Sequence, residues 1–157
     1  MTMMDRIDRK IIAELQRNAT LPIAQLAERV GLSQTPCWKR IQKLELSGLI
    51  TGRVALVDPI KLGLGLTVFV EIEANDHSAA WREGFAKAVV TFPEVIEVYR
   101  MAGDVDYLLK VVISDMLAYD AFYKRLTAEC DLKNVTSQFA MERIHYTTAL
   151  PVNTTDA

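Results

Sequence analysis

The chain contains 157 residues, of which 50% are hydrophobic and 24% are charged, and its formal net charge is −2. The hydrophobic fraction is enough for the packed core of one or two domains and excludes an intrinsically disordered chain. No apolar run approaches the roughly 20 residues of a membrane-spanning helix, and the N-terminal residues lack the apolar region of a secretory signal, so we expect a cytoplasmic protein.

The charge is unevenly distributed along the chain. Residues 1–57 contain nine Lys and Arg against five Asp and Glu, a balance of +4. Residues 58–157 contain nine against fifteen, a balance of −6. Only the N-terminal part therefore has the positive charge that favours binding to a polyphosphate such as DNA.

The N-terminal part predicts three helices. Asp5 can cap a first helix whose apolar residues recur every four positions, from Ile7 to Leu15. Residues 23–30 place apolar side chains at i, i+3, i+4 and i+7, which predicts a short second helix. Gly31 is typical of the residue that ends such a helix.

The predicted third helix has one apolar face and one polar, basic face. Ser33 lies at its N-cap position, and Pro36 falls in its first turn, where a missing N–H costs no hydrogen bond. Cys37, Ile41 and Leu44 share the apolar face. The second and third helices and their short turn form a helix-turn-helix, in which the later helix enters the major groove with its N-terminal residues first.

This geometry predicts that the third helix binds double-stranded DNA. Gln34, Thr35 and Lys39 are candidates for contacts to base edges, while Arg40 and Lys43 are candidates for contacts to phosphates. The full set of candidate DNA-binding residues comprises Ser33, Gln34, Thr35, Pro36, Trp38, Lys39, Arg40 and Lys43.

Two alternatives stay open for this helix. Trp38 can stack on a sugar edge or pack on the first helix at the boundary of the core. The polar face can also be no more than the solvated outer surface of a three-helix bundle. The charge asymmetry favours DNA binding over that simpler interpretation.

Beyond Gly48 the pattern changes to alternating strands and helices. Residues 49–57 predict a wing or linker strand. Further elements follow as a strand at 66–74, a helix at 79–92, strands at 95–102 and 106–114, a helix at 116–129 and a strand within 135–147. The order βαββαβ predicts an α+β, ferredoxin-like domain with both helices on one face of an antiparallel sheet.

These patterns divide the chain into a helix-turn-helix domain at 1–50, a linker strand and hinge at 51–65, and a ferredoxin-like domain at 66–157. We expect the sheet face without helices to include parts of Val68, Tyr99 and Leu109. That face is too apolar for water and predicts a dimer.

The polar residues predict no catalytic or metal site. Cys37 and Cys130 lack metal-ligand spacing, and His77 and His145 have no obvious nucleophile or acidic partner. We therefore expect no metal, no cofactor and no enzymatic activity, with both cysteines reduced rather than redox-sensing. The alternative is a ferredoxin-like small-molecule-binding enzyme or metabolite-binding module without DNA binding, which leaves the basic N-terminal part unexplained.

Several sequence blocks occur in a characteristic order: DRIDRKIIAELQRN, LAERVGLSQTPCWKRIQKLE, the VDP that ends the linker, MAGDVDYLLKVV and TSQFAMERI. Together they resemble the Lrp/AsnC family of bacterial and archaeal transcription regulators, over residues 4–151. The resemblance implies a winged-type DNA-binding domain and a ferredoxin-like domain for effector binding and oligomerisation. It further implies dimers assembled through their sheets, gathered into octamers, that control amino-acid metabolism genes.

The resemblance also implies an amino-acid effector bound between dimers. The aligned candidate effector-binding residues are Met101, Gly103, Asp104, Asp106, Tyr107, Thr136 and Gln138. Backbone groups beside Gly103 can bind an α-carboxylate, and Asp104 can hold an α-ammonium. Gln138 departs from the hydroxyl residue that the family often has there, and a plain hairpin is the alternative for this turn. The segments TPCWKR, YRMAG and FAMERIHYTTALP look most like a branch that responds to L-cysteine; a branched-chain amino acid is the alternative effector.

Overall fold

The computed structural model describes residues 4–154. This part of the chain forms two compact units: unit 1 contains residues 4–56 and 144–154, and unit 2 is Val57–Arg143. The segment after residue 143 thus groups with the N-terminal unit, whereas the sequence led us to place it with the ferredoxin-like domain.

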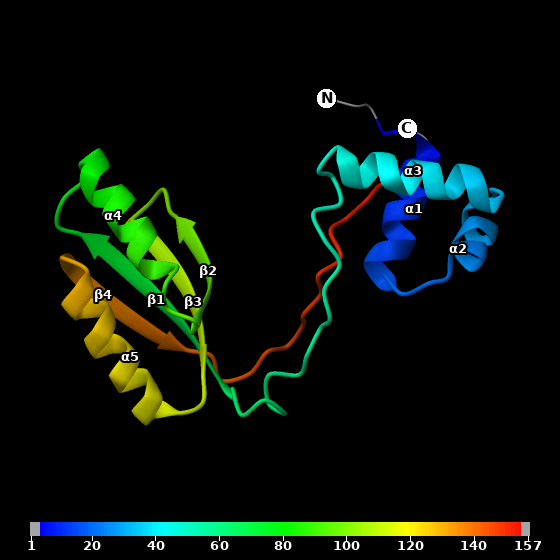
Figure 1. Ribbon diagram of the computed structural model, residues 1–157. Coiled ribbons are helices and arrows are strands. Elements are labelled where there is room, and N and C mark those ends of the chain that lie inside the picture. Colours follow the sequence, from blue (N-terminus) through cyan, green and yellow to red (C-terminus); the bar gives the residue numbers. More distant parts are fainter. Residues whose placement is uncertain (1–3, 155–157) are drawn as a thin grey trace. The chain divides into compact units, whose positions relative to one another are not determined.

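Unit 1 is built on three helices, which are α1 (Arg6–Arg17), α2 (Ile23–Val30) and α3 (Gln34–Leu46) (Figure 1). A capping box starts α1, because the Asp8 N–H donates to Asp5 Oδ1 (2.8 Å) and the Asp5 N–H donates to Asp8 Oδ2 (3.3 Å). At the end of α2, Gly31 adopts the left-handed conformation with φ 76°. The predicted cap and helix end are both confirmed.

One apolar core holds these helices together. Its buried residues are Ile11, Leu26, Ala27, Val30, Cys37, Ile41 and Leu44. The three that α3 contributes are the residues that its periodicity assigned to the apolar face. Burial of this face leaves the opposite face of α3 to solvent.

The linker strand expected over residues 49–57 does not form. Residues 51–58 of the described chain have no strand hydrogen bonding, and an extended segment becomes a strand only when a neighbouring strand pairs with it. The chain then turns over residues 59–64, where the Leu64 N–H donates to the Pro59 carbonyl at 2.8 Å. The β-branched residues of this segment therefore led us to predict a strand that residues 51–58 do not form.

Unit 2 has the predicted βαββαβ order. Its elements are β1 (Leu66–Ala74), α4 (Ala79–Val89), β2 (Val95–Arg100), β3 (Tyr107–Ile113), α5 (Met116–Glu129) and β4 (Leu132–Phe139). The strands form one antiparallel sheet in the order β2-β3-β1-β4, and both helices cover the same face (Figure 1). The ferredoxin-like prediction is confirmed.

The two faces of this sheet differ in polarity. Val68, Val70 and Leu109 are completely buried against the helices. Our expectation that Val68 and Leu109 belong to the uncovered face is therefore wrong by one residue of alternation, because both faces of these strands carry apolar residues. The face without helices, which we call the open face, carries Thr67, Phe69, Glu71, Tyr99, Leu108, Lys110, Val112, Thr136 and Gln138.

None of the helices in residues 4–154 has the length and hydrophobicity needed to cross a membrane.

Candidate DNA-binding and effector sites

The face of α3 opposite the core, together with the residue before the helix, presents a polar surface. Exposed candidates of the DNA-binding set are Ser33, Gln34, Thr35, Pro36, Trp38, Lys39 and Lys43. The first turn of α3 carries no acidic residue, so its N–H groups and positive dipole end are not offset by a local carboxylate. Within the described chain, Lys39 and Lys43 have no carboxylate within ion-pair distance, which leaves both ammonium groups available to an external anion.

Arg40 differs from the other candidates on α3. Its Nη1 donates to Asp5 Oδ2 at 2.6 Å and to Asp8 Oδ1 at 2.7 Å. The Asp8 N–H and then the Arg40 guanidinium hold the pKa of Asp5 below its usual value, and the same carboxylates raise the pKa of Arg40. The sequence predicts that Arg40 contacts a DNA phosphate. In the structure Arg40 instead joins α3 to the start of α1 through these ion pairs. From the sequence we expected Asp5 only to cap α1, and nothing in the spacing pointed to Asp8 as a partner of Arg40.

Trp38 lies at the edge of the core. Its side chain is 50% exposed, and it borders a hollow of about 250 Å³ whose lining includes Leu15 of α1 and Ile23 of α2. The hollow also contains Arg53, which pairs with Glu45 at 2.9 Å. Trp38 therefore contacts the bundle with one part of the ring and solvent with the other.

The turn between β2 and β3 contains four of the candidate effector residues, which are Met101, Gly103, Asp104 and Asp106. The Met101 N–H donates to the Asp106 carbonyl at 2.8 Å, which closes a loop with Gly103 and Asp104 exposed at its tip. Gly103 has φ 156°, a value at which an L side chain is strained. A ligand can therefore reach both the free backbone of this loop and the Asp104 carboxylate.

Asp106 has a structural role at the base of the same turn. Its Oδ2 accepts the Ala74 N–H at 2.8 Å, and its own N–H donates to the Ile72 carbonyl at 2.9 Å. His77 Nδ1 lies 3.5 Å from Asp106 Oδ1. These contacts fasten the turn to the irregular end of β1, so the Asp106 carboxylate is already in use.

Tyr107 lies in the core of unit 2. Its side chain is buried, and its ring centroid lies 4.6 Å from that of Phe85 and 6.0 Å from that of Trp81. The ring packs beneath α4, away from the turn. Its placement corrects our expectation of a direct contact to the effector, which relied on the resemblance to the family and not on packing.

Thr136 and Gln138 lie on the open face at the other edge of the sheet. Thr136 is paired with Glu71 of β1, and Gln138 Nε2 donates to Glu71 Oε1 at 2.9 Å. Two strands, β1 and β3, separate β4 from β2, which corresponds to about 10–15 Å. One copy of the chain thus does not bring the turn and these two residues into a single pocket.

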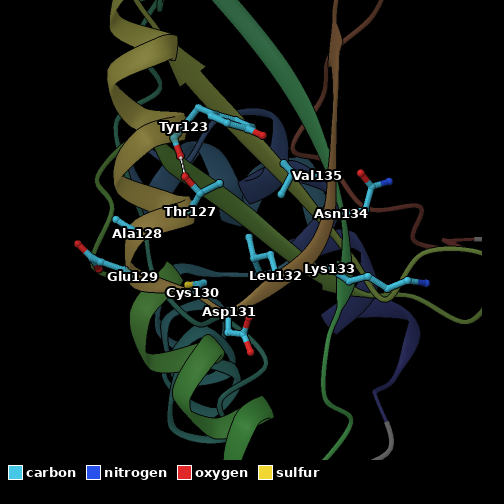
Figure 2. A pocket seen from close by; sticks show the side chains of 10 residues that line it. All are labelled: Tyr123, Thr127, Ala128, Glu129, Cys130, Asp131, Leu132, Lys133, Asn134 and Val135. Carbon is cyan, nitrogen blue, oxygen red and sulfur yellow. Dashed lines mark hydrogen bonds between the residues drawn. The ribbon is translucent and has the colours of Figure 1, made fainter.

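A hollow of about 520 Å³ lies between α5 and β4 (Figure 2). Its lining residues are Tyr123, Thr127, Ala128, Glu129, Cys130, Asp131, Leu132, Lys133, Asn134 and Val135. Asp131 already accepts from Asn75 (2.7 Å), and Lys133 pairs with Glu73 (2.9 Å). Burial raises the pKa of the Cys130 thiol, which makes it a poor nucleophile. No spacing in the sequence pointed to this hollow.

Within residues 4–154, no group of three His, Cys, Asp or Glu residues is close enough together to hold a metal ion.

Two family models match the chain. The AsnC-type helix-turn-helix domain matches residues 4–45, and the Lrp/AsnC ligand binding domain matches residues 67–150. The chain belongs to the Lrp/AsnC family. Both family models match the order of the two predicted domains.

Relatives of this Lrp/AsnC family member include transcription factors. It is 52% identical over 151 residues to the DNA-binding transcriptional activator DecR of Escherichia coli (strain K12), covering 96% of this chain and 99% of the relative. It is 46% identical over 149 residues to the glutamate uptake regulatory protein of Zymomonas mobilis, covering 95% and 91%. These similarities extend over both units.

Solved structures of transcriptional regulators have the same fold. An AsnC family transcriptional regulator from Agrobacterium tumefaciens is 57% identical, with a TM-score of 0.92 and coverage of 94% of this chain and 97% of that one. The transcriptional regulator NMB0573 of Neisseria meningitidis, solved as a complex with L-Met, is 35% identical with a TM-score of 0.92, covering 96% and 98%.

Proposed function

We propose that this Lrp/AsnC family member is a DNA-binding transcription regulator of amino-acid metabolism genes, with α3 as its recognition helix. The observation that carries the proposal is the exposed polar face of α3, where Lys39 and Lys43 have no carboxylate partner among residues 4–154. The similarity of nearly the whole chain to two regulatory proteins supports the proposal. Such a regulator acts in the cytoplasm, where the chromosome is.

The roles on α3 follow from geometry. Gln34, Thr35 and Lys39 read base edges, and Lys43 binds a phosphate. Ser33, Pro36 and Trp38 flank the contact. Arg40 keeps its ion pairs with α1 and orients the helix rather than neutralising a phosphate.

DNA binding is tested by titrating a duplex from the gene's own upstream region at several salt concentrations. Each phosphate contact contributes about 0.9 to the slope of log affinity against log salt. A regulator that makes several contacts therefore loses affinity steeply between low and moderate salt. An affinity that does not change with salt, or no binding in dilute buffer, would refute the proposal.

We further propose that an amino acid binds at the turn between β2 and β3. The exposed Asp104 carboxylate receives the α-ammonium, and the backbone around Gly103 receives the α-carboxylate. Met101 lines the same loop, while Asp106 positions it. Thr136 and Gln138 contribute from another copy, which accounts for their separation from the turn in one chain.

The chemistry of the effector side chain is a separate question. The complex of the Neisseria meningitidis protein with L-Met supports the class of ligand. We keep L-cysteine as the proposed effector and a branched-chain amino acid as the alternative. Calorimetric titration of the purified protein with each of the twenty amino acids discriminates them, and binding of none of them would overturn the effector proposal.

Assembly uses the open face. Its apolar residues, Phe69, Leu108 and Val112, lie in a sheet face that no helix covers, so a second copy of the sheet is the occupant that buries them. We propose a homodimer formed in this way, which assembles further to an octamer. In this scheme residues 1–50 bind DNA, residues 51–65 are the hinge, and the predicted effector and oligomerisation domain of 66–157 is shortened at residue 143, because residues 144–154 group with unit 1.

A further inference from the structure

The hollow of about 250 Å³ beside Trp38, which we call the unit 1 hollow, has an apolar wall. Its aliphatic lining residues, which offer no hydrogen-bonding side-chain atom, are Leu15, Leu21, Ile23, Leu26 and Ile41. Leu26 and Ile41 belong to the buried core, and the other three are half-buried. Because water gains no hydrogen bonds from such a wall, the hollow favours an apolar group as its occupant.

An ion pair lies at the exposed edge of the same hollow. Arg53 Nη2 is 2.9 Å from Glu45 Oε1, and the two side chains are 42% and 43% exposed. An exposed ion pair contributes little to stability, so its two groups can separate and pair with a ligand at little cost. A guanidinium beside a carboxylate is complementary to a zwitterion, which carries one charge of each sign.

Two further side chains of α3 border the hollow. Trp38 is 50% exposed, and its ring can cover an apolar side chain. Gln42 is exposed, and its amide has no side-chain hydrogen bond among residues 4–154. This amide can donate to a carboxylate. The lining therefore combines an apolar wall with polar groups of both charges at its exposed edge.

The size of the hollow limits the ligand. A cavity of about 150 Å³ lined by aliphatic and aromatic side chains accepts benzene. The 250 Å³ of the unit 1 hollow thus accommodates a side chain of that size together with two small charged groups. Pockets for drug-sized ligands start at about 300 Å³. A larger molecule such as a nucleotide therefore does not fit.

We propose that the unit 1 hollow binds a free α-amino acid with an apolar side chain of the size of leucine. The side chain contacts the apolar wall, Arg53 and Gln42 hold the α-carboxylate, and Glu45 holds the α-ammonium. This site shares no residue with the turn between β2 and β3, which lies in unit 2. It is additional to the proposed effector site and requires neither that site nor DNA binding.

An apolar side chain from a second copy of the chain is the competing occupant. Such a side chain would cover the apolar wall but would make no use of the two opposite charges at the edge. A zwitterion matches both the wall and the charges, so charge complementarity favours the free amino acid. A ligand in this position also touches Trp38, the residue before Lys39 on the proposed recognition helix.

The test monitors the fluorescence of Trp38. The chain has two tryptophans, so the full chain with Trp81→Phe retains Trp38 alone. Titration with L-leucine should shift the emission to shorter wavelength in a saturable way, because the ligand displaces water from the exposed part of the indole. No response up to about 10 mM L-leucine would overturn the proposal.

Variants of the ion pair test the two charged contacts. Arg53→Gln and Glu45→Gln should each raise the Kd for L-leucine about 10- to 100-fold, because each loses a charged hydrogen bond to the ligand. Lys124→Gln breaks an exposed ion pair with Asp120 in unit 2 and is the matched control. Its Kd should stay within about twofold of the parent protein. Unaltered affinity in both Arg53→Gln and Glu45→Gln would refute the assigned contacts.

Two changes test the apolar wall. L-Alanine should bind about 50-fold more weakly than L-leucine, because three fewer carbons are buried. Leu21→Phe enlarges a side chain of the wall without altering any charge, so it should abolish binding of L-leucine. Equal affinities for the two amino acids would show that the wall does not hold the side chain, and the proposal would then be wrong.

Three outcomes separate this site from the other proposals. Asp104→Ala should leave the Trp38 response intact; loss of the response would assign the ligand to the turn in unit 2 and overturn the proposal. Emission of Trp38 that depends on protein concentration and not on L-leucine would show that a second copy fills the hollow, which also overturns it. A chain that binds L-leucine beside Trp38 but binds no duplex would retain this inference and refute the proposed function.

Discussion

Asp8 Oδ1 of α1 lies 2.7 Å from Arg40 Nη1 of α3, so a residue that caps one helix also anchors the helix proposed to enter the DNA groove. The Asp8 side chain is only 8% exposed and that of Arg40 33%. Removing one member of a partly buried pair leaves the other charge poorly solvated, which costs more than the pair itself contributes. The bond therefore fixes the orientation of α3 more than it adds stability.

Arg40→Ala should lower the free energy of unfolding of unit 1 by about 1–3 kcal/mol, because Asp8 keeps its buried carboxylate without a counter-charge. Lys39→Ala on the same helix should leave stability within about 0.5 kcal/mol, since Lys39 is exposed. Urea unfolding followed by circular dichroism measures both. Equal stability of the two variants would mean that the Arg40 cluster is only a surface contact.

Lys39→Ala and Lys43→Ala should weaken DNA binding in different ways. Loss of a base contact at Lys39 should raise the Kd for the specific duplex by about 5- to 150-fold. Loss of a phosphate contact at Lys43 should instead reduce the salt slope by about 0.9. Lys87→Ala on α4, an exposed lysine outside unit 1, is the control and should change neither quantity. Fluorescence anisotropy at several salt concentrations separates these outcomes.

Asp104→Ala should weaken amino-acid binding by about tenfold or more, because it removes the proposed partner of the α-ammonium. Its thermal stability should not change, as the side chain is exposed. Asp106→Ala should lower the Tm, because the Ala74 N–H loses its acceptor. Asp106→Asn keeps an acceptor oxygen and should retain most of that stability. Calorimetry of an Asp104→Ala protein with undiminished binding would remove Asp104 from the site.

Unit 1 should become less stable in acid. Hydrogen bonds from the Asp8 N–H and Arg40 lower the pKa of Asp5 from 3.8, and Arg29 lowers that of Glu14 from 4.5. A carboxyl group whose pKa is lower in the folded state stabilises the fold above its unfolded pKa, and this contribution is lost as the pH falls through the folded pKa. We expect the decline to begin below about pH 4.5. Glu14→Gln should flatten the pH profile of the Tm; an identical profile would rule out this contribution.

Phe69→Glu should dissociate the proposed dimer, because it places a carboxylate on the open face. Leu117→Glu on α5 is a matched control, since Leu117 is 81% exposed on the helix-covered side of the sheet. Sedimentation velocity reports the change in mass. A Phe69→Glu protein of unaltered mass would mean that another surface joins the subunits.

Periodicity identified the elements of this fold more accurately than the partners of individual side chains. The i, i+3, i+4 pattern located Cys37, Ile41 and Leu44 in the core because a helix has only one buried stripe. The same reasoning failed for Val68 and Leu109, where both faces of the strand are apolar and alternation does not reveal which is covered.

The candidate site residues divide in the same way: features that depend on neighbouring residues were predicted, and contacts between distant residues were not. Asp104 and Gly103 were placed on an exposed turn because turn chemistry is local. The ion pair between Arg40 and Asp8 and the packing of Tyr107 under Phe85 join residues far apart in the sequence. Such contacts depend on how the helices and strands pack against one another. No local spacing of residues in a single sequence reveals that packing.

Two hydrogen bonds join the Gln16 amide of α1 to the backbone of Leu150, and this has a practical bearing on dissecting unit 1. Unit 2 is one uninterrupted piece of chain, whereas unit 1 is made from two pieces that are far apart in the sequence. A DNA-binding fragment ending near residue 56 leaves the Gln16 amide facing water, and a bulky fusion placed after residue 150 crowds the first helix. Joining 144–154 to the shorter fragment through a flexible spacer restores the native neighbour.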